Sequence, residues 1–198
     1  MPLAPRNRQL FCIGAGLVLA ACASHSSAAP GDDAQACAPD VADHDSAVTH
    51  SYAVVHGWPE LSEGFVLGQV SGVAIDSHRH VFVFHRADHP WLDAPGTTVI
   101  TAPTLLRLSA DTGRIEASLG AGMFVVPHGL RIDAHDHLWV TDVGLHQVFE
   151  LDHDGTVLRS FGTAGVPGAD ATHFDQPTDV AVAPDGGFYV SDGYGNSR

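Results

Sequence analysis

Three residues with useful chemistry stand at corresponding ends of neighbouring strands predicted from this sequence. His128 precedes a short alternating strand, whereas Arg86 and Tyr194 each follow a strand that runs in the opposite direction. An imidazole can bind a metal or transfer a proton, and a guanidinium can hold a carboxylate through two hydrogen bonds. A phenol can serve as a base when its ionised form is stabilised. These side chains could form one site if the fold brings them to the same face.

The elements that must position these residues form a repeat. Three segments align without gaps, and they read GVAIDSHRHVFVFHR (72–86), GLRIDAHDHLWVTDV (129–143) and DVAVAPDGGFYVSDG (179–193). Each contains an apolar strand, a polar turn and a second strand rich in aromatic and β-branched residues. The middle copy is followed by two more strand-like segments, HQVFELD (146–152) and TVLRSFG (156–162).

Four antiparallel strands per unit, recurring after 57 and then 50 residues, are typical of a β-propeller. A propeller closes with about 4–8 blades. The sequence supplies two nearly complete blades and the first half of a third. We therefore predict an all-β propeller with about two and a half blades, and we expect a longer parent protein, because an open array leaves exposed edges.

Propeller geometry predicts where the chemically useful residues lie. The first strand of a blade lines the central channel and the second returns antiparallel to it, so the start of the first and the end of the second share one face. The repeat equivalents of His128 are Ser71 and Thr178, so the histidine is not a repeat feature. Arg86 and Tyr194 also depart from the repeat. The simpler interpretations are a turn histidine, a solvated or acid-paired arginine, and a tyrosine that covers the channel mouth.

Two H-x-H pairs, His78/His80 and His135/His137, have a spacing that can bind metal. They fall in the turns between first and second strands, on the face opposite to His128. We interpret them as solvated loop residues.

Composition limits the function classes. The formal net charge of the chain is −14, which argues against nucleic acid as a partner because such binding requires a basic surface. Hydrophobic residues make up 44% and charged residues 16% of the sequence, which indicates a folded domain rather than a disordered chain.

The first 21 residues are typical of a targeting segment. Arg6 and Arg8 precede a short apolar run that ends in the sequence LAAC, which resembles a bacterial lipobox. We predict a lipoprotein signal peptide at 1–21 and lipidation of Cys22; the alternative is an ordinary signal peptide with a chance cysteine. Residues 22–50 are small and acidic, which indicates a flexible tether, and 51–198 form the N-terminal part of the propeller domain.

This organisation predicts a location in the bacterial cell envelope. The protein would face the periplasm or the exterior, and a lipid anchor would be its contact with the membrane.

Several of these motifs together resemble a known family. The matching stretches are LGQVSGVAID (67–76), VFHRADHPW (83–91), PHGLRIDAHDHLWVTDVGLHQVFELD (127–152) and PGADATHFDQPTDVAVAPDGGFYVSDGYGNSR (167–198). In this order they resemble peptidyl-α-hydroxyglycine α-amidating lyase, the lyase half of peptidylglycine α-amidating monooxygenase. The resemblance covers most of residues 65–198.

The resemblance implies a six-bladed propeller of the NHL-repeat type with zinc and calcium in its channel. It implies that His128 is one of three zinc ligands, the other two belonging to later blades. The calcium would take backbone carbonyl oxygens from Val73 and Leu130, with a carboxylate from a later blade. Arg86 matches an active-site arginine of the family, and Tyr194 matches the proposed catalytic base.

The implied activity is cleavage of the C–N bond in a peptidyl- or N-acyl-α-hydroxyglycine, which yields an amide and glyoxylate. A peptidylglycine hydroxylase is a possible partner that would supply this substrate. The alternative function is a non-catalytic NHL-repeat propeller lipoprotein that binds a protein or peptide partner on the same face. A propeller hydrolase acting on sugars or lactones ranks third, because the first two units offer no channel cluster of acids and Asn.

One departure from the family pattern concerns the loop of Tyr194. Animal members carry a disulfide between the positions of Asp175 and Gly195, and that bond is impossible here. The loss removes a restraint on the loop but no catalytic group.

Overall fold

The computed structural model describes residues 52–91 and 96–198. Within these ranges the regular elements are β-strands, and no helix capable of crossing a membrane is found among them. The predicted signal peptide, the predicted tether and the predicted lipidation site Cys22 lie outside the described residues.

The strands form two four-stranded sheets and one two-stranded sheet, all antiparallel, in strict chain order. The first sheet contains β1 (Val70–Ile75), β2 (His80–His85), β3 (Leu105–Ser109) and β4 (Ile115–Leu119). The second contains β5 (Pro127–Ile132), β6 (Leu138–Asp142), β7 (Gln147–Leu151) and β8 (Val157–Phe161). The last contains β9 (Asp179–Val182) and β10 (Phe188–Ser191).

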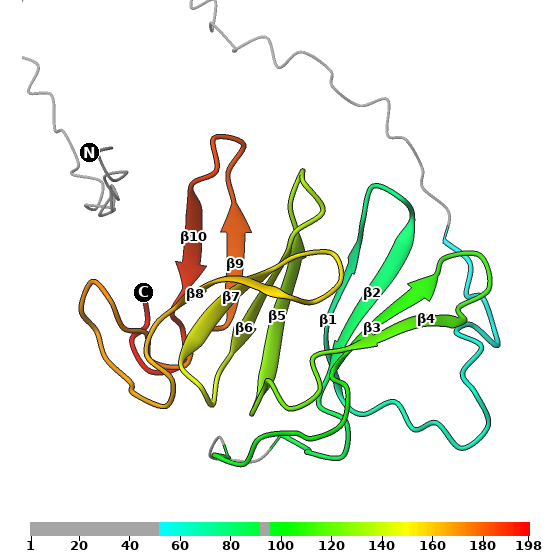
Figure 1. Cartoon of the computed structure of the whole chain (residues 1–198), viewed down its shortest axis with the longest axis horizontal. Helices are drawn as coiled ribbons and strands as arrows, with labels where there is room; N and C mark the ends of the chain where they lie inside the picture. The colour runs from blue at the N-terminus through cyan, green and yellow to red at the C-terminus, as the bar shows by residue number, and fades with distance from the viewer. Residues whose placement is uncertain (1–51, 92–95) are drawn as a thin grey trace, which may run out of the picture. The chain divides into compact units, whose positions relative to one another are not determined.

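The three sheets follow one another side by side, and their first strands β1, β5 and β9 are neighbours (Figure 1). This is the arrangement of successive propeller blades around inner strands. The prediction of an all-β propeller with two and a half blades is therefore confirmed.

The core lies between the blades, because alternate residues of one strand point to opposite faces of its sheet. On β2, Phe82 and Phe84 are fully buried against Leu130 and Val140 of the second blade. On β6, the neighbouring side chain Trp139 points the other way and packs on Phe188, with ring centroids 4.9 Å apart. Each face of the middle blade is thus covered by an adjoining blade, which explains its continuous apolar strands.

Two glycines at equivalent repeat positions allow the inner strands to approach closely. A Cβ atom on Gly72 would lie 2.7 Å from Cβ of Leu130 and 3.0 Å from its backbone nitrogen. A Cβ atom on Gly129 would lie 2.7 Å from the carbonyl oxygen of Thr178. Any larger residue at these positions would push β1, β5 and β9 apart.

We predict that Gly72→Ala lowers the free energy of unfolding by about 1–3 kcal/mol, because its methyl group must displace the backbone of Leu130. Urea denaturation measures this change. Gly96→Ala is the matched control, since a Cβ there meets no atom within 4 Å. Equal stabilities of the two variants would contradict the role assigned to Gly72.

Candidate functional site

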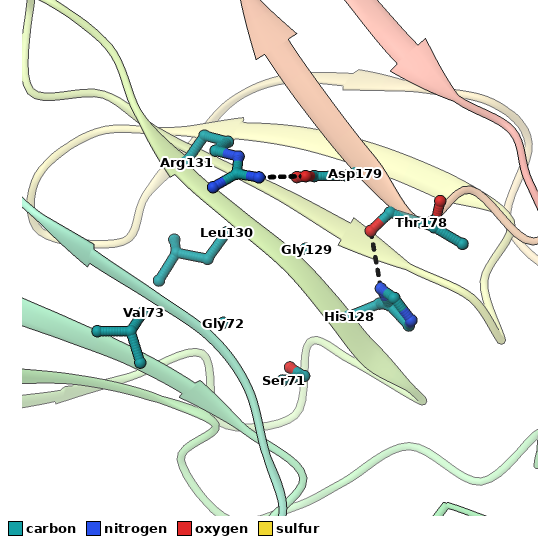
Figure 2. A pocket seen from close by; sticks show the side chains of 9 residues that line it. All are labelled: Ser71, Gly72, Val73, His128, Gly129, Leu130, Arg131, Thr178 and Asp179. Atoms are coloured by element: carbon teal, nitrogen blue, oxygen red, sulfur yellow. Dashed lines mark hydrogen bonds and ion pairs between the residues drawn. The ribbon is translucent and has the colours of Figure 1, made fainter. Parts of the chain in front are cut away.

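A pocket of about 380 Å³ runs along the inner strands (Figure 2). Its lining comes from β1, from β5 and from the start of β9. The residues are Ser71, Gly72, Val73, His128, Gly129, Leu130, Arg131, Thr178 and Asp179. The pocket therefore contains the three repeat-equivalent positions that the sequence singles out.

His128 lies inside β5, as its second residue, so the prediction that it precedes the strand is wrong. The β5–β6 register shifts between Pro127 and Leu130, and this irregularity includes the histidine. A shift of this kind is not encoded in the alternation of apolar residues, which marks the strand only from Leu130 onward. Ser71 likewise lies within β1, whereas Thr178 stands directly before β9.

The hydrogen bonds of His128 define its tautomer. Nδ1 lies 2.7 Å from the carbonyl oxygen of Thr178, and because a carbonyl only accepts, Nδ1 is the donor. Nε2 of the neutral ring then carries a lone pair, and the hydroxyl of Tyr194 donates to it across 3.1 Å. Burial lowers the pKa of His128, an effect that the Thr178 bond opposes and the nearby charge of Arg86 strengthens.

Arg86 directly follows β2 and is 9% exposed. Its Nε donates to the carbonyl oxygen of Pro127 across 3.0 Å, and its Nη1 donates to Oε1 of Gln69 across 3.3 Å. Its Nη2 donates to no residue in the described part of the chain. Burial lowers the pKa of this guanidinium, while attraction to Tyr194 and Asp142 raises it.

Trp91 joins these side chains into one cluster and was not identified from the sequence as a site residue. Its ring lies 4.9 Å from the guanidinium carbon of Arg86 and 5.6 Å from the Tyr194 ring. Its backbone nitrogen donates to Gln69 across 2.6 Å. Trp91 does belong to the stretch VFHRADHPW, which resembles the lyase family. Neither the strand pattern nor the residue spacing, however, predicts which side chains it contacts.

Tyr194 follows β10 and is 55% exposed, so its hydroxyl can be reached from solvent. The structure therefore brings His128, Arg86 and Tyr194 together at the end of the inner strands, as the repeat geometry predicts. Val73 and Leu130 line the same pocket from adjacent strands, and an ion pair between Arg131 and Asp179 lies beside them.

Buried residues at one repeat position hold the loops that carry the site. Asp142, at the end of β6, accepts hydrogen bonds from the backbone nitrogens of Val125 at 2.7 Å and Leu145 at 2.8 Å. Its repeat equivalent Asp192 accepts from the backbone nitrogen of Asp175 at 2.8 Å. Burial raises the pKa of Asp142, and these backbone donors counteract the rise.

His85 occupies the same repeat position in the first blade. Its Nδ1 accepts a hydrogen bond from the backbone nitrogen of Ala87 at 3.1 Å, on the far side of Arg86. Burial lowers the pKa of this imidazole. Sequence reasoning missed these three residues, although the motifs WVTD and YVSD place an aspartate at one register.

Asp175 and Gly195 lie face to face, which agrees with the pairing of these positions implied by the family pattern. The backbone nitrogen of Gly195 donates to the carbonyl oxygen of Asp175 across 3.0 Å. A Cβ atom on Gly195 would lie 2.1 Å from Cγ of Asp175. The backbone nitrogen of Asp175 in turn donates to Asp192 across 2.8 Å, so backbone hydrogen bonds tie the Tyr194 loop where a disulfide is absent.

Comparison with known proteins adds evidence about the family that this chain resembles. Residues 174–198 match the family model described as the NHL repeat. The chain is 46% identical over 155 residues to the peptidylglycine alpha-amidating monooxygenase of Rattus norvegicus. The aligned region covers 71% of this chain and 16% of that protein. It is 42% identical over 142 residues to a probable peptidyl-alpha-hydroxyglycine alpha-amidating lyase of Caenorhabditis elegans, covering 67% and 40% of the two chains.

A third relative is peptidyl-alpha-hydroxyglycine alpha-amidating lyase 2 of Drosophila melanogaster, 38% identical over 158 residues, with 73% of this chain and 38% of that protein covered. Homologues of the chain are thus amidating lyases and an amidating monooxygenase, and the chain carries an NHL repeat. The chain spans between 16% and 40% of the length of these relatives.

We predict that Asp142→Asn lowers the free energy of unfolding by about 1–3 kcal/mol, because the amide group turns one acceptor oxygen into a donor that faces backbone N–H groups. Urea denaturation reports the change. Asp111→Asn is the control, since the Asp111 side chain is 83% exposed. If the two variants unfold alike, Asp142 does not hold this loop.

Proposed function

We propose that the protein is a lyase that cleaves the C–N bond of a peptidyl- or N-acyl-α-hydroxyglycine. One observation carries this proposal: the Tyr194 hydroxyl lies 3.1 Å from Nε2 of His128, whose other nitrogen is fixed by Thr178. The homology to named amidating lyases supports the same reaction class.

The reaction needs one base, one proton source and a way to hold the substrate. The α-hydroxyl loses its proton, its oxygen forms a carbonyl with the α-carbon, and the C–N bond breaks. The departing nitrogen takes a proton, so the products are an amide and glyoxylate. No electron transfer occurs, and the atoms balance without a further reactant.

His128 has the donor chemistry expected of a zinc ligand. Its Nδ1 donates to a backbone carbonyl, which is the partner that commonly orients a metal-bound histidine, and its Nε2 lone pair, which here accepts from Tyr194, would bind the metal in place of that hydrogen bond. Zinc bound there would act as a Lewis acid that lowers the pKa of the substrate hydroxyl. Calcium in the channel would take the backbone carbonyl oxygens of Val73 and Leu130 in a structural role, as this ion prefers oxygen ligands.

Tyr194 is the base in this proposal. Its hydroxyl already forms a hydrogen bond at the site, and its exposure lets a substrate hydroxyl reach it. The Arg86 guanidinium attracts the ionised phenol, which is the form that accepts a proton.

Arg86 holds the substrate carboxylate. Its Nε and Nη1 are engaged by Pro127 and Gln69, so the guanidinium is fixed in orientation. Nη2 remains to donate to a carboxylate oxygen, and the Trp91 ring against the guanidinium limits its movement. The substrate would then lie between Arg86 and Tyr194, with its α-hydroxyl toward His128.

We predict that Tyr194→Phe in the full-length protein lowers the rate of glyoxylate release from a peptidyl-α-hydroxyglycine by about 10²–10⁴-fold, the contribution of a general base. Tyr189→Phe is the matched control, because Tyr189 lies within β10 and, among the described residues, forms no hydrogen bond with His128 or Arg86; it should keep the parent rate. Unchanged turnover of Tyr194→Phe would reject the proposed base. Absence of lyase activity in the parent protein would favour the non-catalytic binding function.

We also predict that Gly195→Ala lowers the same rate by about tenfold or more, since a displacement of about 1 Å at a catalytic group can cost 10²-fold. The added methyl group collides with Asp175 and must move the Tyr194 loop. Gly187→Ala, whose Cβ would only approach the end of the Asp185 side chain at 3.2 Å, should retain activity. Equal rates would show that loop position does not limit the reaction.

A further inference from the structure

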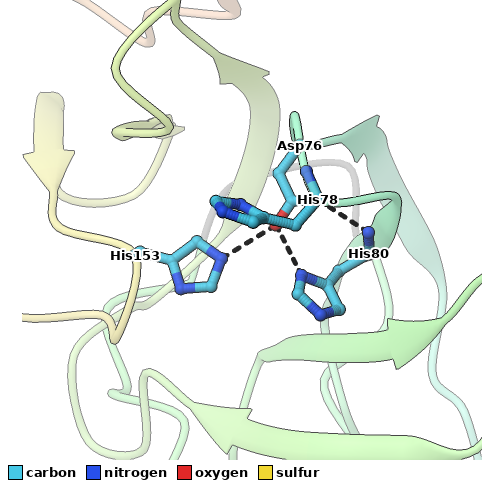
Figure 3. A group of neighbouring side chains, drawn as sticks. All are labelled: Asp76, His78, His80 and His153. Carbon is cyan, nitrogen blue, oxygen red and sulfur yellow. Dashed lines mark hydrogen bonds and ion pairs between the residues drawn. The ribbon is translucent and has the colours of Figure 1, made fainter.

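A second cluster of ligand-type side chains joins the first two blades, and it uses different residues from the proposed lyase site. It consists of Asp76, His78, His80 and His153 (Figure 3). The first three come from the β1–β2 turn and the start of β2. His153 comes from the turn between β7 and β8. The interpretation of the H-x-H pairs as solvated loop residues is therefore wrong for His80 and His137, which are half-buried and bonded to Asp76 and Glu150 respectively.

The Asp76 carboxylate is the centre of this cluster and is 5% exposed. Its Oδ2 lies 2.7 Å from Nδ1 of His80 and 2.8 Å from Nε2 of His153. Nδ1 of His78 is 4.0 Å from the same oxygen. One ligand atom from each of the four residues lies within 4.8 Å of all the others.

We propose that Asp76, His78, His80 and His153 form a binding site for a divalent transition-metal ion such as zinc, which clips the first blade to the second. Three imidazoles and one carboxylate are a donor set that zinc accepts in tetrahedral sites. Bonds of about 2.0–2.1 Å require such ligands to lie about 3.3–3.5 Å apart. The side chain of His78 is 65% exposed and can rotate inward to complete the set.

Neighbouring acids can orient the ligands once the metal is bound. His80 and His153 now hydrogen-bond to Asp76 through the ring nitrogens that would bind the metal, so in each ring the proton would move to the other nitrogen. Nε2 of His80 lies 3.5 Å from a carboxylate oxygen of Glu116, which can accept a hydrogen bond from the N–H of the ring nitrogen that the metal leaves unused. Nδ1 of His78 lies 3.3 Å from Asp136, so a rotation of this exposed ring that brings Nε2 to the metal would leave Nδ1 to donate to that carboxylate.

Arg107 is the charged group that opposes the proposed metal. Its Nη1 donates to Nδ1 of His153 across 3.0 Å, and it also lies 3.3 Å from the Asp154 carboxylate. Because Asp154 can keep this guanidinium after His153 changes its tautomer, Arg107 need not leave the site. Asp76, Asp136 and Glu116 outweigh its positive charge.

The equivalent turn of the second blade provides an internal comparison. Asp133, His135 and His137 repeat the D-x-H-x-H pattern of the first blade. There His135 is exposed, and His137 pairs at 2.8 Å with Glu150, which lies on β7 of the same blade. Arg159 also pairs with Glu150. Within the described residues, the first turn thus meets a histidine of the next blade, whereas the second turn meets a carboxylate of its own blade.

Zinc titration of the full-length protein tests this proposal, in a His128→Ala background that removes the channel histidine. Isothermal titration calorimetry with zinc chloride should detect a site whose affinity falls about tenfold or more in His78→Ala and in His153→Gln. His135→Ala, which removes the exposed equivalent of His78 in the second blade, should change the affinity by less than about twofold. Thermal unfolding should show that zinc raises the Tm of the background protein but not of His78→Ala.

The controls separate loss of the site from loss of the fold. His78 is largely exposed, so its alanine variant should unfold like the parent protein in the absence of zinc. The proposal is overturned if zinc does not bind the background protein, or if His78→Ala and His135→Ala bind zinc equally. Because glyoxylate release depends on other residues, failure here leaves the proposed lyase activity to its own test.

Discussion

The close approach of the inner strands is the constraint on which the arrangement of this protein depends. Gly72 and Gly129 leave room for the backbone of the next blade where a methyl group would not fit. This contact sets the distance between β1, β5 and β9, and the pocket follows their edges. It also places the carbonyl oxygen of Thr178, from one blade, within reach of His128 from the preceding blade. A local property of two residues thereby determines an inter-blade hydrogen bond.

The conformation of the loops that carry the site depends on a second feature, which is a buried polar residue at the end of the second strand in each blade. Asp142 and Asp192 bind backbone N–H groups of the loops around them, and His85 does the same beside Arg86. Buried carboxylates are costly unless such donors satisfy them, so each loop is restricted to the conformation that supplies the donors. The residues that follow can then differ from blade to blade, while the buried polar residue that holds each loop keeps the same repeat position. Arg86 and Tyr194 occupy different positions after the same structural anchor.

Local patterns in the sequence predict much of this structure, but contacts between blades escape them. The alternating residues and polar turns locate the strands, and the repeat predicts that His128, Arg86 and Tyr194 share a face. The register shift between Pro127 and Leu130 includes His128 in β5 without altering the apolar pattern. That pattern therefore places the start of the strand too late. Trp91 meets its partners through tertiary packing alone. Roles in catalysis and metal binding came from the family resemblance, because a strand pattern carries no information about reactivity.

The D-x-H-x-H turns show how one repeated motif acquires two environments. In both blades the first aspartate accepts backbone N–H bonds and shapes the turn, as Asp76 does for the backbone nitrogen of His80 at 2.7 Å. The motif itself therefore has a sufficient structural reason to recur. The described contacts differ: His153 of the next blade approaches Asp76, whereas Glu150 of the same blade, with its Arg159 partner, pairs with His137. An arginine-paired carboxylate completes a salt-bridge network, and a third imidazole completes a set of metal ligands. The chemistry of each turn is thus decided by contacts with other strands rather than by the motif.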